Sequence, residues 1–100
     1  MNASFRTYQL SVLLYRQCAC LKLPHHLQDQ LLRASSSIAL NLAEGNAKSS
    51  IKDQRRFFEI AFGSLREVQS ILDLANGRDD IKTLADKTAA HLYKLIHYLS

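Results

Sequence analysis

Residues 30–45 of the chain read QLLRASSSIALNLAEG, and residues 55–68 read RRFFEIAFGSLREV. Both stretches repeat apolar residues three or four positions apart, the spacing that places them on one face of an α-helix. Both are also rich in alanine, serine or glycine, and small side chains at helical spacing let two helix backbones approach closely. The two stretches therefore predict neighbouring, tightly packed helices in an all-α fold.

Apolar periodicity and helix-boundary residues predict four helices in one domain spanning residues 1–100. The predicted ranges are about 4–22, 24–44, 50–75 and 79–98. Pro24 suits the start of a helix, and Gly45 suits the left-handed position after a helix end. Ser50 followed by Asp53 suits an N-cap. Short connections between long amphipathic helices favour an up-down-up-down antiparallel four-helix bundle.

The apolar arcs of these helices are wider than a four-helix core needs. The first helix is expected to face the core with Phe5, Tyr8, Val12, Tyr15 and Ala19. Leu10 and Leu14 then lie on its opposite side, and Leu40, Phe57 and Ile60 extend the arcs of the next two helices. A monomer rarely exposes so much contiguous apolar surface. We therefore expect a homo-oligomer with these five residues at its interface; the alternative is a monomer with deeply buried helices.

Basic residues outnumber acidic residues, giving a formal net charge of +4. A basic strip follows the third predicted helix and the loop before it, and residues 1–23 contain no acid. Such patches suit the phosphates of a nucleic acid. The candidate contacts are Lys48, Lys52, Arg55, Arg56, Arg6 and Lys22. An ordinary solvated helix face would carry similar charges, so both interpretations stay open at this stage.

Three positions in the quoted stretches call for a structural partner. Glu44 lies in the last turn of its helix, where a carboxylate opposes the helix dipole. The cations expected to clamp it are Lys48, Arg55 and Arg56. Asn41, one turn earlier, can bond to the loop backbone. Gly63 weakens the middle of its helix, so we expect it to permit close contact with the preceding helix.

No residue pattern indicates catalysis, a cofactor or a metal site. His91 and His97 are six apart, not the four that places two ligands on one helix face. The serines at 35–37 lie inside a predicted helix without a base nearby. Cys18 and Cys20 are two apart, which on a helix points them away from each other, and both are expected to be buried hydrophobic residues. We expect a protein that is not an enzyme.

The N-terminal region only faintly resembles a secretory signal. Gln9 and Ser11 interrupt its apolar run, and Arg16 closes it before any small-residue cleavage site. No charge-free run approaches the roughly 18 residues that a membrane-spanning helix needs. These features favour a cytoplasmic protein without a membrane segment.

The two quoted stretches resemble the signature of the four-helix bundle proteins known as 23S rRNA intervening-sequence proteins. The residues of the signature include Arg33, Asn41, Glu44, Gly45, Gly63 and Ser64. The resemblance covers the middle two helices closely and the outer two by pattern only. Leu42 stands where the family commonly has isoleucine, and Asn46-Ala47-Lys48 replaces a loop richer in glycine and arginine.

This resemblance implies a non-enzymatic protomer that assembles as a ring, typically a homopentamer, with a basic surface suited to nucleic acid. The accessory protein of diversity-generating retroelements is similar in fold and works with a reverse transcriptase and its template RNA. We therefore expect an oligomeric protein that binds structured RNA. The alternative is an adaptor or accessory factor that binds another protein, for example a reverse transcriptase.

Overall fold

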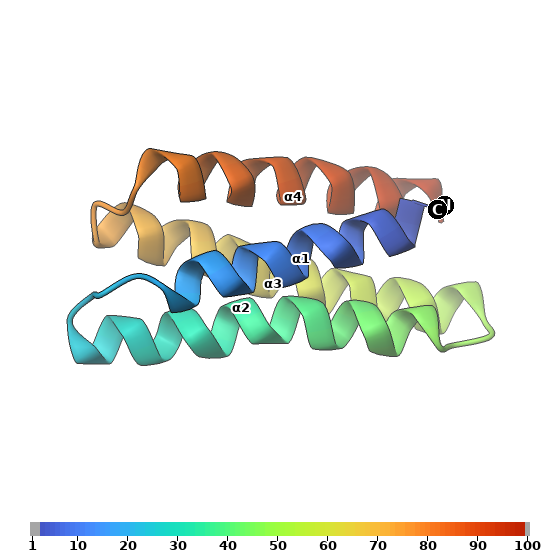
Figure 1. Ribbon diagram of the computed structural model, residues 1–100. Coiled ribbons are helices and arrows are strands. Elements are labelled where there is room, and N and C mark those ends of the chain that lie inside the picture. Colours follow the sequence, from blue (N-terminus) through green and yellow to red (C-terminus); the bar gives the residue numbers. More distant parts are fainter. Residues whose placement is uncertain (1–2, 100) are drawn as a thin grey trace.

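The computed structural model describes residues 3–99, and within that range it contains four α-helices and no β-strand. The helices are α1 (Ala3–Ala19), α2 (His25–Asn46), α3 (Ile51–Leu74) and α4 (Asp79–Tyr98) (Figure 1). The predicted all-α fold is confirmed. The helices lie roughly along one long axis, in a body of 40 × 21 × 19 Å.

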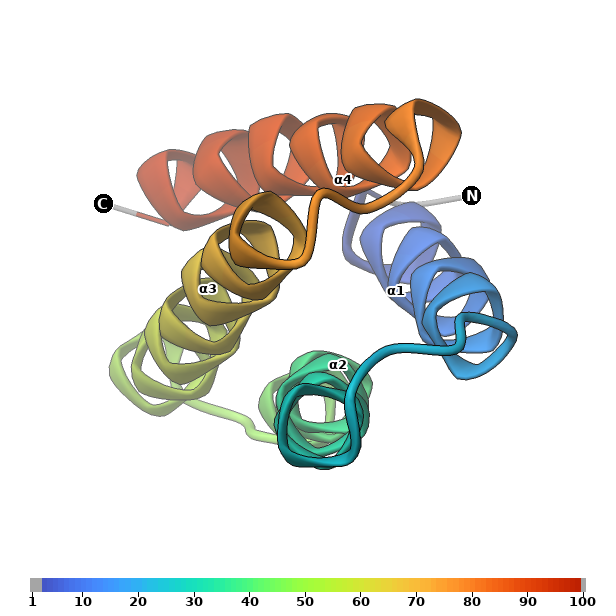
Figure 2. The ribbon, with the colours of Figure 1, turned by 90° about the vertical axis from the view of Figure 1, so that its left-hand side faces the viewer.

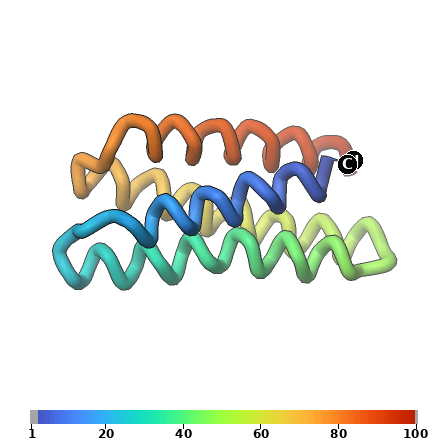
Figure 3. Tube along the Cα trace, viewed as in Figure 1, coloured from blue at the N-terminus to red at the C-terminus, as the bar shows by residue number. Residues whose placement is uncertain are grey.

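Each helix packs against the helices before and after it, and α4 closes the arrangement by packing against α1 (Figure 2). The α1–α2 and α3–α4 loops lie at one end of the molecule (Figure 3). The α2–α3 loop lies at the other end, where α1 begins and α4 ends. Residues at the start of α1 therefore share an end of the molecule with the N-terminal half of α3.

The core runs the length of the bundle and is made of aliphatic side chains with one fully enclosed aromatic residue, Phe58. Four hydroxyl residues are also buried: Thr7, Ser11, Ser35 and Thr88. Each hydroxyl donates to a backbone carbonyl three or four residues earlier in its own helix, at 2.6 to 2.8 Å. Since no buried side-chain hydroxyl among residues 3–99 lacks a hydrogen-bond partner, these small side chains permit close helix packing at little cost.

The inward face of α1 is the reverse of the one predicted. Leu10 and Leu14 are buried, while Phe5 and Ala19 are exposed. The periodicity was equally good for both faces, because α1 has apolar residues around most of its circumference. The buried hydroxyls of Thr7 and Ser11 also lie on the core face of α1. In the sequence, these polar residues argued against assigning that face to the core. The expectation that Leu10 and Leu14 line an oligomer interface is wrong, because both belong to the protomer core.

Two helix ends differ from the prediction by more than one residue. α1 stops at Ala19 rather than 22, and α2 continues through Gly45 to Asn46. At the end of α3 the left-handed residue is Asn76, with φ of 51°, and the next N–H, of Gly77, bonds to the Leu72 carbonyl at 2.8 Å. This is a Schellman-type helix end with asparagine at its left-handed position.

Other boundaries follow from local hydrogen bonding. The Ser50 hydroxyl accepts a hydrogen bond from the Asp53 N–H at 3.1 Å, as predicted for the start of α3. α4 begins after Arg78 with no side-chain cap, and Asp79 and Asp80 lie in its first turn, where carboxylates favour the helix dipole.

Neither helix glycine has its predicted role, and Gly45 has the one predicted for Gly63. A Cβ on Gly45 would lie 2.5 Å from the Phe58 ring, so Gly45 provides the close approach of α2 to α3. It lies inside α2 with a negative φ, not at a left-handed end. Gly63 is exposed, and nothing stands within 4 Å of a Cβ built there. The expected contact of Gly63 with α2 is therefore absent.

Candidate nucleic-acid interface

The seam between α2 and α3 is held by a small hydrogen-bond network. The Ser37 and Ser64 hydroxyls bond to each other across the helices at 2.8 Å. The Asn41 side-chain amide donates to the Ser37 hydroxyl at 3.0 Å and to the Ser37 carbonyl at 2.9 Å. The sequence predicted that Asn41 bonds to the loop backbone. In the structure Asn41 instead supports the seam, through Ser37. These hydrogen bonds link α2 to α3 part-way along the two helices.

The loop between α2 and α3 is tied down beside this seam. Of the three cations predicted to clamp Glu44, Lys48 forms the ion pair, at 3.6 Å. The Gln54 side-chain amide donates to the Lys48 carbonyl at 3.2 Å. Lys48 and Arg56 also lie over the Phe57 ring, 5.2 and 4.9 Å from its centroid. Two cations on one half-buried ring cover Phe57 and give this end of the hairpin a basic surface.

Lys48, Lys52, Arg55 and Arg56, the α3 basic strip, lie at this end of the molecule, and three of them line one shallow depression with Asp53 and Glu59. Carboxylates offset much of the positive charge. Arg55 bonds to Glu59 at 3.1 Å, in addition to the pair that Lys48 forms with Glu44. Among residues 3–99 neither Lys52 nor Arg56 has an ion pair. These two side chains therefore carry the uncompensated charge of the strip.

A second basic surface lies where α1 meets α4, and we call it the α1–α4 basic cluster: Arg6, Lys87, His91 and Lys94. Burial lowers the pKa of His91 below its usual value, and the positive charges of Arg6, Lys87 and Lys94 lower that pKa further. Within the described range none of these three cations forms an ion pair with a carboxylate. Among residues 3–99 this cluster therefore holds three cations without a carboxylate partner, against two in the α3 basic strip.

Sequence reasoning found only Arg6 of this cluster. The other members lie on α4, where Lys87, His91 and Lys94 are four and three residues apart and so share one helix face. A signal was present, because the sequence from Lys87 to its last residue contains no acid. Lys22, the remaining predicted contact, is exposed in the α1–α2 loop at the opposite end of the molecule.

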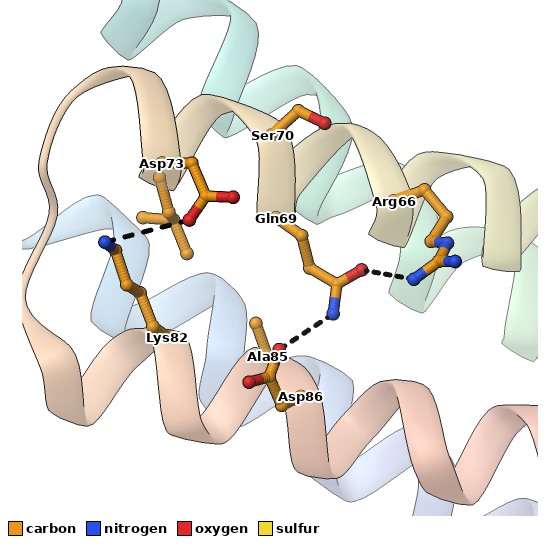
Figure 4. A pocket seen from close by; sticks show the side chains of 8 residues that line it. Arg66, Gln69, Ser70, Asp73, Lys82, Ala85 and Asp86 are labelled. Carbon is orange, nitrogen blue, oxygen red and sulfur yellow. Dashed lines mark hydrogen bonds and ion pairs between the residues drawn. The ribbon is translucent and has the colours of Figure 1, made fainter.

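A polar pocket between α3 and α4 is bridged by interactions among its own lining residues (Figure 4). Lys82 pairs with Asp73 at 3.7 Å, and the Gln69 amide donates to Asp86 at 2.9 Å. Arg66 donates to the Gln69 side-chain oxygen at 3.2 Å. Cations and carboxylates are balanced here, so the pocket joins two helices and does not attract a charged ligand.

Within residues 3–99 no three histidine, cysteine or acidic side chains gather closely enough to hold a metal ion. Burial raises the pKa of the Cys18 thiol to about 11, which keeps it protonated near neutral pH. Cys20, predicted to be buried, is exposed because α1 ends one residue earlier. No helix in the described part of the chain has the length and apolar character needed to cross a bilayer.

Comparison with known proteins agrees with this architecture. No curated protein matches the sequence significantly. The family described as 23S rRNA-intervening sequence protein matches residues 3–100, almost the whole sequence. The match extends the resemblance from the α2–α3 hairpin to α1 and α4, which had been similar in pattern only. The chain therefore belongs to the 23S rRNA-intervening sequence protein family.

Proposed function

We propose that this protein is a non-enzymatic nucleic-acid-binding protein that contacts the phosphate backbone of structured RNA. The observation that carries the proposal is the α1–α4 basic cluster, where Arg6, Lys87 and Lys94 lie close enough to the half-buried His91 to lower its pKa. Lysine and arginine contacts to phosphate supply most of the sequence-independent affinity for nucleic acids. Cations without carboxylate partners are the ones best able to make such contacts.

The α3 basic strip supplies a second, weaker set of contacts. Arg55 and Lys48 must share their charge with Glu59 and Glu44, so each gains less from a phosphate. Lys52 and Arg56 have no carboxylate partner among residues 3–99, so each gains more from contact with a phosphate. The two surfaces together predict a footprint that spans more than one face of the bundle.

We further infer that the up-down-up-down protomer assembles as a homo-oligomeric ring, for which the family resemblance implies a pentamer. Leu40 is 66% exposed on α2 and Ile60 is 47% exposed on α3, next to the half-buried Phe57. Apolar side chains exposed on adjoining helices favour an interface between copies. The α2–α3 side lies diagonally opposite the α1–α4 side, so assembly there leaves the α1–α4 basic cluster open (Figure 2). Light scattering on eluted peaks tests this: a monomer at micromolar concentration would contradict it.

Binding of a structured RNA at increasing salt tests the proposed function. The triple variant Arg6→Gln/Lys87→Gln/Lys94→Gln removes three phosphate contacts, so the log-log salt slope of binding should fall by about 2 to 3. Lys52→Gln/Arg56→Gln should lower the slope by less than 2. The control Arg78→Gln/Lys82→Gln removes two cations that already pair with Asp80 and Asp73, and it should leave the slope unchanged.

Equal slopes for the wild type and the triple variant would refute the proposed phosphate surface.

The exposed side chains of Leu40 and Ile60 favour one second candidate, a protein-interaction adaptor or accessory factor, for example for a reverse transcriptase. Such binding should tolerate salt and should be lost in Leu40→Ala or Ile60→Ala. Leu10 and Leu14 cannot serve that test because they are buried.

A further inference from the structure

Three aromatic side chains form a row on the surface between α3 and α4. The Tyr93 and His97 rings stack with centroids 4.0 Å apart and an interplanar angle of 26°. The Phe62 ring also neighbours Tyr93, with centroids 6.3 Å apart and an interplanar angle of 51°. We call Phe62, Tyr93 and His97 the aromatic row. Tyr93 is 52% exposed, although a surface position on α4 does not require a large apolar ring.

Open space adjoins this row. A cavity of about 190 Å³ is lined by Phe62, Tyr93 and His97, together with the buried Ile96 and the exposed Glu59. Glu59 is the only acidic residue of the lining, and it also lines the depression of the α3 basic strip. The aromatic cavity and the depression of the α3 basic strip therefore adjoin each other at Glu59.

Positive charge flanks the cavity on several sides. The Arg66 guanidinium lies 5.5 Å from the Phe62 centroid, and Arg55 is held at 3.1 Å from Glu59. On α4, Lys94 is adjacent to Tyr93 and three residues before His97, so a member of the α1–α4 basic cluster borders the aromatic row. Basic side chains beside exposed aromatic rings are the features with which proteins bind single-stranded nucleic acids.

We propose that the cavity beside the aromatic row binds one unpaired nucleobase of an RNA strand whose phosphates lie on the two basic surfaces. This inference rests on the proposed function and specifies its substrate as RNA with single-stranded segments. The base stacks against the exposed rings of the row, and Arg55, Arg66 and Lys94 contact the flanking phosphates. A base paired within a helix cannot enter, because its faces are covered by its neighbours in the stack.

Glu59 gives the cavity a preference among bases. Its carboxylate only accepts hydrogen bonds, and Arg55 holds it in place at the cavity edge. Guanine presents two adjacent donors, N1–H and the 2-amino group, on its Watson–Crick edge. Uracil presents one N–H between two oxygens that a carboxylate repels. The cavity should therefore favour guanine over uracil.

The test compares a single-stranded RNA oligonucleotide with an abasic oligonucleotide of equal length and charge. The wild type should bind the base-bearing strand about 5- to 150-fold more tightly, as expected for stacking of one base. The double variant Tyr93→Leu/His97→Leu keeps apolar bulk but removes the rings, and it should abolish that difference. Tyr15→Leu, in a half-buried tyrosine of α1 outside the row, is the matched control and should retain it.

A second experiment measures base preference, and in it one substitution should change two binding affinities in opposite directions. In wild type, an oligouridine carrying one guanine should bind more tightly than plain oligouridine. Glu59→Gln should reduce that preference, yet strengthen binding of the abasic strand, because Arg55 then loses its carboxylate partner. A merely structural role for Glu59 would weaken both.

The outcomes separate the two proposals. Salt-dependent binding of RNA with no advantage for the base-bearing strand would overturn the nucleobase site and leave the proposed function standing. No change in that advantage in Tyr93→Leu/His97→Leu would do the same. Failure of the wild type to bind any RNA would overturn both.

Discussion

Gly45 and Gly63 stand in opposite surroundings, although both lie within the long helices of one hairpin. Gly45 faces the Phe58 ring across the α2–α3 seam, where a Cβ has no room. Gly63 faces open space on the outer side of α3. The seam is a close-packed contact that sets the register of the hairpin. The outer surface of α3 and α4 instead carries exposed rings and charges that are available to a ligand.

The largest expected effect on stability comes from removing the aromatic ring that fills the α2–α3 seam. Phe58→Ala removes a ring that is 2% exposed, and it should lower the free energy of unfolding by about 3 to 5 kcal/mol. Leu74→Ala on the outer surface of the same helix truncates a side chain that is 76% exposed, and its effect should stay within about 0.5 kcal/mol. Urea titration followed by circular dichroism measures both. Similar losses in the two variants would contradict the contrast between seam and outer surface.

The two glycines provide the sharper comparison, since the same substitution should change sign. Gly45→Ala forces the Phe58 ring to shift, and we expect a loss of about 1 to 3 kcal/mol. Gly63→Ala improves helix propensity in open space, and we expect a gain of up to about 1 kcal/mol. Thermal unfolding of both variants at equal protein concentration measures the difference. A destabilised Gly63→Ala would mean that this face of α3 is covered after all.

The smallest expected effect is on the pH dependence of stability, and it concerns His91 in the α1–α4 basic cluster. The folded protein holds the pKa of His91 below the ordinary value of 6.5, so near and just below that pH the unfolded chain binds more protons than the folded one. Stability should therefore fall as the pH drops through the window between 6.5 and the lowered pKa. His91→Gln should remove this part of the pH dependence. Urea midpoints at several pH values measure it.

Lys94→Gln provides the control within the same cluster. It removes one of the three cations that lower the pKa of His91, so its pH dependence should be intermediate between wild type and His91→Gln. RNA phosphates should act in the opposite direction, because negative charge near His91 favours its protonated form. Binding should then take up protons below neutral pH. An identical pH dependence in all three proteins would show that the α1–α4 basic cluster does not act on His91.

Prediction from sequence worked where local chemistry dominates. Helical periodicity identified four helices, and the Ser50 hydroxyl bonds to the Asp53 N–H as an N-cap should. It failed on α1, where apolar residues surround the helix and the buried hydroxyls of Thr7 and Ser11 mark the core side. Periodicity identifies a face only when the opposite face is polar.

The basic surfaces also combine features that the sequence predicts with features that depend on helix packing. The α3 basic strip was visible in sequence because its members lie within nine residues of one another, but its pairing with Glu44 and Glu59 depends on side-chain geometry. The α1–α4 basic cluster combines residues 81 or more positions apart, Arg6 with Lys87 and Lys94, and needed the packing of α4 on α1. The aromatic row likewise joins Phe62 of α3 to Tyr93 of α4.

The sequence by itself determined the helical class, the Ser50 N-cap and the family signature, because these depend on residues within a few positions of one another. Only the tertiary structure decided which side of α1 is buried, which glycine permits close approach and which charges remain unpaired. Those properties depend on atoms from different helices, and their energies exist only once the helices have packed. The candidate RNA surface belongs to this second group, since its cations and aromatic rings come together from α1, α3 and α4.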